Sequence, residues 1–209
     1  DCEDVNIADL YIDPRGPYPK LLGPEFCWDE KRDARTYAGP WPVVAHPPCG
    51  PWSKLRHLYK GSEHDCAPRA VEQVRAFDGC LEHPADSLLW KHCGLPLPGE
   101  LPDAFGGRTL AVDQVDFGHV ARKKSWLYIV GELPSRFDWP TAGVPTHWCS
   151  GFRSGGGRKY PANYKRTGCA VPPGIKVCSA QQRRRTPVAF AEFLISIAQG
   201  SQVNHKETE

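Results

Sequence analysis

The 209-residue chain has no long hydrophobic run. No apolar stretch approaches the roughly 20 residues needed to span a bilayer, so we expect no membrane partner. Its nine cysteines are odd in number and irregularly spaced, unlike the even set of a secreted disulfide framework. The first residues are rich in Asp and Glu and do not resemble a signal peptide. We therefore expect a protein of a reducing cytoplasm, and we expect it to act as a monomer.

Several catalytic and repeat signatures are also missing. The chain has no Gly-x-Ser-x-Gly elbow, so hydrolase chemistry of the Ser/His/Asp kind finds no support. It has no Gly-x-x-x-x-Gly-Lys loop to cradle phosphates, and it has no internal repeat. What it does have is 21 prolines and 20 glycines, which predicts one domain with many loops and short elements.

The most informative stretch is residues 43–53, Val-Val-Ala-His-Pro-Pro-Cys-Gly-Pro-Trp-Ser. Its short apolar start predicts a buried parallel strand, and the two prolines end that strand because each lacks an N–H and fixes φ. Cys49 would then lie on a stiff loop at the carboxyl end of a strand, where open α/β sheets bind ligands. A thiol in that place could be a nucleophile. It could equally be a buried cysteine beside a turn, since free cysteine behaves mostly as a small hydrophobe.

A β-α-β unit follows this stretch. Apolar residues spaced i, i+3, i+4, i+7 predict a helix over 67–77, ended by Gly79. Residues 80–84 then predict a second strand, again stopped by a proline. Such a connection is almost always a right-handed crossover between parallel strands, so the two strands should be neighbours.

The second strand should carry Glu82 and His83 to the same sheet edge as Cys49. A thiol beside a carboxyl suits addition of the thiolate to an electron-poor ring carbon while the acid protonates a ring nitrogen. Burial of Glu82 should raise its pKa and keep it a proton donor near neutral pH. The alternative is a carboxylate at a strand end that pairs with a nearby Lys or Arg.

The remaining elements complete an α/β pattern. We expect a strand over 8–13, a short helix or turn within 27–37, two strands over 109–116 and 125–130 that could pair as a hairpin, and a closing helix over 186–198. Thr186 is a plausible N-cap of that helix, Pro187 suits its first position and Gly200 should follow its end. Together these patterns predict an α/β domain with a mostly parallel sheet.

Residues 132–180 form a Pro/Gly-rich basic insert without a clear period. From 150 to 185 there are nine Lys or Arg and no Asp or Glu, and aromatic residues interleave with the charges. This pattern favours DNA as partner over a merely solvated loop. The candidate DNA-binding residues are Ser53, Arg153, Arg158, Lys159, Lys165 and Arg166.

The insert and its flanks also hold four residues of types that bind zinc: His147, Cys149, Cys169 and Cys178. They could form a tetrahedral site that staples the insert. Their spacing matches no familiar zinc knuckle, so we favour unligated loop residues and expect no metal.

Three elements, in order, resemble the DNA cytosine-5 methyltransferase family. They are Pro-Pro-Cys ending at Cys49, the strand-end Glu82, and the Phe-Gly-His-Val-Ala-Arg-Lys-Lys-Ser block over 117–125. The resemblance covers roughly residues 25–131 and the last helix, and it extends to short methyltransferase-like proteins of bacteriophages and prophages. It implies a Rossmann-like, class I methyltransferase-like sheet in the cytoplasm, that of the bacterial host if the protein is phage-encoded.

The resemblance also implies site roles. Cys49 would attack C6 of a flipped or single-stranded cytosine, Glu82 would donate a proton to N3, and Arg122 with Lys123 would hold the base or its phosphate. The basic insert would take the place of the family's target-recognition region. Residues 1–131 and 181–200 would form the α/β domain, and residues 201–209 would be a frayed tail.

The cofactor implied by the resemblance is S-adenosylmethionine. The candidate contacts are Asp13, Trp28, Asp29, Asp33 and Pro48. Where the family has a glycine-rich loop, residues 13–18 hold one glycine and two prolines; His83 and Ala121 also replace the family's Asn and Gln. Two alternatives therefore stay open: a DNA-binding module of this fold without a cofactor, and a pyrimidine C5 modification that uses a different donor.

Overall fold

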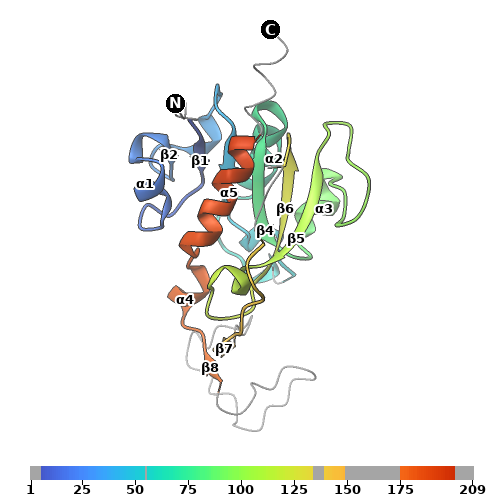
Figure 1. The fold of residues 1–209 in the computed structure, drawn as a ribbon. Helices are drawn as coiled ribbons and strands as arrows, with labels where there is room; N and C mark the ends of the chain where they lie inside the picture. The colour runs from blue at the N-terminus through green and yellow to red at the C-terminus, as the bar shows by residue number, and fades with distance from the viewer. Residues whose placement is uncertain (1–5, 55, 134–138, 149–174, 201–209) are drawn as a thin grey trace.

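A six-stranded sheet forms the centre of the protein (Figure 1), in a computed structural model that describes residues 6–54, 56–133, 139–148 and 175–200. The strand order is β2-β1-β3-β4-β6-β5. The strands are β1 (Ala8–Leu10), β2 (Cys27–Trp28), β3 (Val43–Ala45), β4 (Gly79–Pro84), β5 (Arg108–Asp113) and β6 (Lys124–Val130). The first four run parallel, and β6 runs antiparallel to both of its neighbours. The predicted α/β class with a mostly parallel sheet is confirmed, and it is compatible with a Rossmann-like fold.

Helices cover both faces of this sheet. They are α1 (Tyr18–Leu21), α2 (Cys66–Phe77), α3 (Leu88–Cys93), α4 (Ala180–Arg184) and α5 (Val188–Gly200). The buried side of α2 packs with Val43, Ala45 and Leu81 on one face. Helix α5 packs with Val44 and Cys80 on the other, because successive strand residues point to opposite faces. The parallel strands are therefore apolar on both sides, as a sheet covered on two faces requires.

The predicted β-α-β unit is confirmed as β3, α2 and β4, with β3 and β4 parallel neighbours. Gly79 does not simply end the helix, as expected, but opens β4. Its φ is 104°, and a Cβ there would lie 2.0 Å from the Val43 carbonyl oxygen. Only glycine allows the two strands to approach so closely at this point. The helix itself ends at Phe77, and Asp78, the C-cap residue that follows it, has a φ of 63°.

Other expectations need correction. Residues 27–37 hold the two-residue strand β2 before a 3₁₀ turn over Ala34–Thr36, rather than a helix or turn alone. The strand expected over 109–116 ends at Asp113, and a 3₁₀ turn over Gln114–Phe117 begins the connection of the confirmed β5–β6 hairpin. Gly200 is the last residue of α5 rather than the residue after it.

The ends of the basic insert come together below the main sheet in Figure 1. Strand β7 (His147–Trp148) pairs in parallel with β8 (Lys176–Val177) as a separate small sheet. The middle of the insert, 149–174, and the tail, 201–209, lie outside the described residues. In the described part of the chain, the helices are all too short or too polar to cross a membrane.

Candidate active site

Cys49 lies at the carboxyl edge of the sheet, as its position after β3 predicts. The strand ends at Ala45, and the loop then tightens into a 3₁₀ turn over Gly50–Trp52. The Trp52 N–H donates to the Cys49 carbonyl at 3.1 Å, so the backbone around the thiol is held in place. Among the described cysteines, Cys49 is the exposed one. Cys49 therefore lies on a stiff loop at the surface of the protein.

Glu82 lies on β4, next to this loop, in a polar setting rather than an apolar one. Its side chain is only 11% exposed. Ser125 Oγ donates to Glu82 Oε1 at 2.5 Å, and Gln114 Nε2 donates to the same oxygen at 3.0 Å. His46 Nδ1 lies 3.5 Å from the other oxygen, Oε2. Groups from three separate segments thus converge on one carboxylate.

His46 and Tyr18 extend this network, and sequence reasoning missed both. His46 Nε2 lies 2.6 Å from Tyr18 Oη. Tyr18 is buried and belongs to the four-residue helix α1, for which the Pro/Gly-rich sequence gives no periodic signal. The position of His46 directly after a buried strand, three residues before the thiol, was a usable signal for that residue.

The charge state of Glu82 is the opposite of the one predicted. Burial raises the pKa of Glu82, but the hydrogen bond with His46, the charges of Lys123 and His46, and the hydrogen bond from Ser125 outweigh it and lower the pKa to about 2. The expectation of a raised pKa was wrong because it counted burial alone and not the donors that surround the carboxylate. Glu82 is therefore ionised in the free protein at neutral pH.

The charge of the Glu82 carboxylate acts on the Cys49 thiol. The pKa of the Cys49 thiol is raised, first because protein groups around the sulfur desolvate the thiolate and then because Glu82 is negative. The positive charges of Lys123 and Arg184 act in the other direction. The Cys49 thiol is therefore protonated at neutral pH. The ionised Glu82 carboxylate can accept its proton.

The resemblance assigns two basic residues to the target base, and in the structure their side chains lie in different surroundings. Lys123 lies where its charge acts on both Cys49 and Glu82. Arg122, the residue before it, instead lies 3.6 Å from Asp113 and lines a neighbouring cavity. Lys123 is thus beside the reacting groups, and a role of Arg122 toward the target base stays a prediction.

His83 does not present its side chain at the edge, contrary to expectation. It is 1% exposed, and its Nδ1 lies 2.8 Å from Ser87 Oγ. Burial outweighs the nearby charge of Glu82 and the Pro48 backbone and lowers the pKa of His83 to about 4, so the ring is neutral. His83 is therefore packed inside the protein near the backbone of Pro48 and is not presented at the sheet edge.

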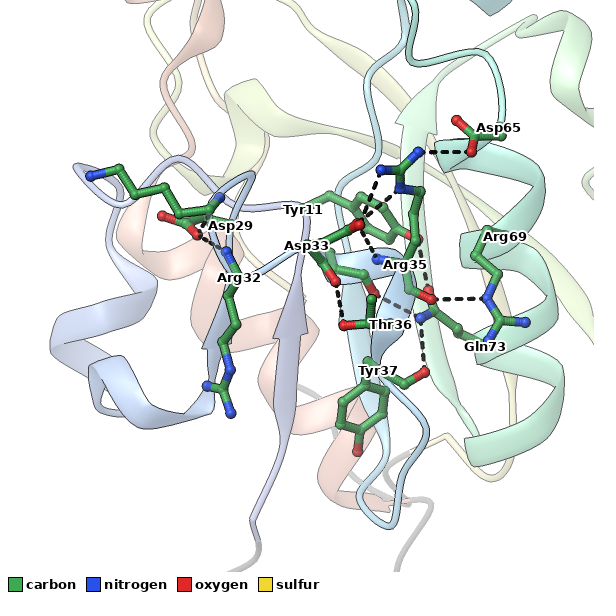
Figure 2. A network of polar contacts seen from close by, with 12 residues as sticks. Tyr11, Asp29, Arg32, Asp33, Arg35, Thr36, Tyr37, Asp65, Arg69 and Gln73 are labelled. Carbon is green, nitrogen blue, oxygen red and sulfur yellow. Dashed lines mark hydrogen bonds and ion pairs between the residues drawn. The ribbon is translucent and has the colours of Figure 1, made fainter.

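The residues that the resemblance assigns to the cofactor already have partners. Asp13 forms an ion pair with Arg15 at 2.7 Å, and Asp33 forms one with Arg35 at 2.8 Å. Figure 2 shows Asp33 and Arg35 bonded together and Asp29 turned toward its own loop. Each of these carboxylates is therefore engaged with residues close to it in sequence.

The ring expected to stack on adenine is covered. Trp28 is buried, and the Arg32 guanidinium carbon lies 3.6 Å from the centre of its ring. Tyr37 packs edge-on against the ring at 4.8 Å. Asp29 Oδ1 accepts the backbone N–H of Lys31 and of Arg32, both at 2.9 Å, which holds Arg32 in this turn. The remaining candidate, Pro48, is half-buried beside Cys49. In this arrangement the candidate residues do not fit S-adenosylmethionine.

Few of the other candidates fall in the described part of the chain. Ser53 Oγ donates to the Gly50 carbonyl at 3.2 Å, within the Cys49 loop. The remaining DNA-binding candidates, Arg153, Arg158, Lys159, Lys165 and Arg166, lie outside the described residues.

The zinc candidates are likewise only half described, because Cys149 and Cys169 lie outside the described residues. His147 Nδ1 lies 2.9 Å from Thr146 Oγ1, and buried Cys178 follows β8, with its N–H bonded to the Trp148 carbonyl. Within the described ranges, no group of three or more His, Cys, Asp or Glu could hold a metal ion.

Comparison with known proteins adds no family. No protein-family model matches the chain, and no curated protein matches it. The function must therefore be argued from the fold and from the groups that converge at the sheet edge.

Proposed function

We propose that this protein modifies cytosine in DNA through a covalent adduct, in the manner of the DNA cytosine-5 methyltransferases that it resembles. The observation that carries the proposal is the placement of Cys49 and Glu82 at the carboxyl edge of the neighbouring parallel strands β3 and β4, where the negative charge of Glu82 acts on the thiol. This is the edge at which α/β sheets bind their ligands. The reversed strand β6 and the strand order are compatible with the class I methyltransferase fold that the resemblance implies.

The addition step follows from the charge states of the two groups. Cys49 Sγ attacks C6 of cytosine with its own electron pair, the C5=C6 pair shifts to form a C4=C5 double bond, and the C4=N3 pair moves onto N3, so the ring becomes an enamine. The thiol proton leaves sulfur and finishes on ring N3. Glu82, ionised and next to both, relays that proton and then holds the protonated N3 by a charge-assisted hydrogen bond.

The adduct makes C5 nucleophilic, so C5 takes a proton from water or bonds to another electrophile. The ring is restored when C5 loses its original hydrogen as a proton, the C5=C6 bond re-forms with expulsion of the thiolate from C6, and N3 gives up its proton. Lys123 stabilises the thiolate on its way in and on its way out. A cytosine inside a duplex cannot reach the thiol, so the substrate is a flipped or single-stranded base. S-adenosylmethionine, when bound, would supply a methyl group to C5; since its candidate residues do not fit it here, no step is derived through it.

The test does not depend on any donor. In the adduct C5 exchanges its hydrogen with water, so single-stranded DNA with deuterium at cytosine C5 should lose that label when incubated with the protein. Mass spectrometry of the recovered nucleosides measures the loss. Cys49→Ala should abolish exchange, and Glu82→Gln should slow it by roughly 100-fold or more, the usual value of a positioned acid or base.

The matched control is Cys93→Ala, which removes a half-buried thiol of α3 away from this edge. It should exchange at the rate of the unmodified protein. Exchange that persists in Cys49→Ala, with the fold intact by circular dichroism, would remove the thiol from the mechanism.

A second candidate function is a DNA-binding module of this fold without a cofactor. The contact of Arg32 with the Trp28 ring favours it, because the surface expected to receive adenine is filled by the chain itself. The same experiment separates the two candidates. A module would bind the labelled DNA and leave the C5 deuterium in place, whereas the enzyme would release it whether or not a donor is present.

A further inference from the structure

A hollow of about 610 Å³ lies directly beside the proposed catalytic edge. Its walls come from the end of β5, the start of β6 and the segment around Trp139. The volume lies within the roughly 300–1,000 Å³ typical of ligand sites. Ser125 belongs to its lining, and the same Ser125 hydroxyl donates to Glu82. Ser125 thus belongs both to the lining of the hollow and to the hydrogen-bond partners of the Glu82 carboxylate.

Two tryptophans line the hollow. Trp126 is half-buried and packs edge-on against Trp90 of α3, with ring centroids 5.4 Å apart. This contact with the core fixes the orientation of the Trp126 ring. Trp139 is 58% exposed, and its ring meets that of Phe193 with centroids 5.7 Å apart. A large, exposed aromatic surface next to a second fixed ring is suited to stacking a flat group.

Each carboxylate that lines the hollow has a hydrogen-bond donor or a cation of the protein near it. Asp113 Oδ1 accepts the backbone N–H of Lys123 at 2.8 Å, Asp116 Oδ1 accepts that of Gly143 at 2.8 Å, and Asp86 lies 3.5 Å from Lys54. Asp113 and Asp116 thus each accept a backbone N–H, and Asp86 has Lys54 nearby, which offsets part of the repulsion that these carboxylates exert on an anionic ligand; Asp113 Oδ2 accepts no hydrogen bond from the described residues.

The cations of the hollow are more available. Lys124 is exposed, and its side chain forms no ion pair with any described residue. Arg122 is exposed and makes one long contact of 3.6 Å with Asp113. The hollow therefore combines aromatic faces with two cations at its mouth, the pairing that binds a base and its phosphate in single-stranded nucleic acid.

We propose that this hollow is a subsite for the nucleotide that adjoins the target cytosine on a single-stranded segment of DNA. The base of that nucleotide stacks on Trp139, and its phosphate lies between Arg122 and Lys124. Because Ser125 belongs both to this hollow and to the contacts of Glu82, a nucleotide next to the reacting cytosine would lie at the hollow. The assignment to a neighbouring nucleotide rests on the proposed function, whereas binding of single-stranded DNA in the hollow can be measured without it.

The experiment uses fluorescence anisotropy of a labelled oligo-dT, which contains no cytosine and so cannot react with Cys49. Trp139→Ala should weaken binding about 5- to 100-fold, the effect of losing one stacked base, and Trp139→Phe should restore part of it. Phe105→Ala is the matched control, since Phe105 is also an exposed aromatic, at 54%, but lies outside the hollow. It should bind oligo-dT unchanged.

A second experiment tests the contact between Lys124 and the phosphate. Lys124→Ala should reduce the slope of log affinity against log salt by about 1, because one phosphate contact is lost. Lys91→Ala, on the exposed side of α3, should leave the slope unchanged. Thermal melting of each variant confirms that its fold is retained. Unchanged oligo-dT binding in both Trp139→Ala and Lys124→Ala would overturn the subsite.

Two further outcomes are decisive. Thymidine monophosphate that binds as tightly as oligo-dT would show a site for free nucleotides and would overturn the assignment to a DNA strand. Loss of oligo-dT binding in Trp139→Ala, together with no C5 exchange in the unmodified protein, would uphold the DNA-binding hollow while refuting the cytosine chemistry. The two proposals can therefore fail separately.

Discussion

The ionised state of Glu82 should make a measurable contribution to stability, and Glu82→Gln is the variant that removes it. Glutamine keeps the size of the side chain and an oxygen to accept from Ser125 and Gln114, but it cannot titrate. The pKa of Glu82 falls from an ordinary value of 4.5 to about 2 in the folded protein. A depressed folded pKa means that the stabilisation is complete above the unfolded pKa and is lost as pH falls through the folded one.

The size of the effect follows from that depression. At about 1.4 kcal/mol per pKa unit, the ionised carboxylate contributes on the order of 3 kcal/mol to the free energy of unfolding near pH 7. The side chain is 11% exposed, so screening by solvent takes little of this away. About 2 kcal/mol of it should be gone at pH 3, where the unfolded chain binds the proton and the folded protein mostly does not.

Urea unfolding followed by tryptophan fluorescence at pH 6 and pH 3 measures the effect. The difference in the free energy of unfolding between the unmodified protein and Glu82→Gln should shrink by about 2 kcal/mol at the lower pH. Titrating groups that do not interact with Glu82 cancel in that difference. Glu72→Gln, at an exposed carboxyl that pairs with Arg69, serves as control and should show no such change. A difference that stays constant or widens as pH falls would refute the argument that polar donors keep Glu82 ionised.

Two further predictions concern the thiol and the sheet. Alkylation of Cys49 by iodoacetamide, followed by peptide mass mapping, should keep accelerating above the ordinary thiol pKa of about 8.5, because the pKa of this thiol is raised. Lys123→Ala should slow the reaction at fixed pH by removing a charge that favours the thiolate; faster alkylation in that variant would contradict the assignment. Gly79→Ala should lower the free energy of unfolding by at least about 1–3 kcal/mol, since a Cβ there meets the Val43 carbonyl at 2.0 Å on backbone with φ 104°. An unchanged urea midpoint would show that the two strands are not packed so closely.

The longer elements were predictable because their own sequences carry the periodic signal. Helix α2 repeats its apolar residues every three or four positions, and β3 and β4 are short apolar runs stopped by proline. The short elements were not predictable in this way. Strand β2 has two residues and exists because Cys27 and Trp28 pair with β1. Helix α3 has six residues and depends on its Ser87 cap and on the burial of Trp90.

The candidate site also has one part that the sequence predicts and another that depends on the folded structure. That Cys49 and Glu82 would end neighbouring parallel strands could be read from the chain, because one crossover connects them and crossovers have a fixed hand. The ionisation of Glu82 could not be read, because it depends on groups brought from other elements: His46, Ser125 and Lys123. Likewise the sequence offers Trp28 as a stacking surface, and only the folded turn shows Arg32 lying over it.

By itself, then, the sequence determined the α/β pattern and the strand ends at which a thiol and a carboxyl are presented, because backbone periodicity, prolines and crossover handedness act over short stretches of chain. The tertiary structure alone decided the charge on that carboxyl, the partners of the acidic residues near β1 and β2, and the hollow beside Ser125. Each of these depends on distances between residues far apart in the chain, and Coulomb and hydrogen-bond energies change steeply with such distances.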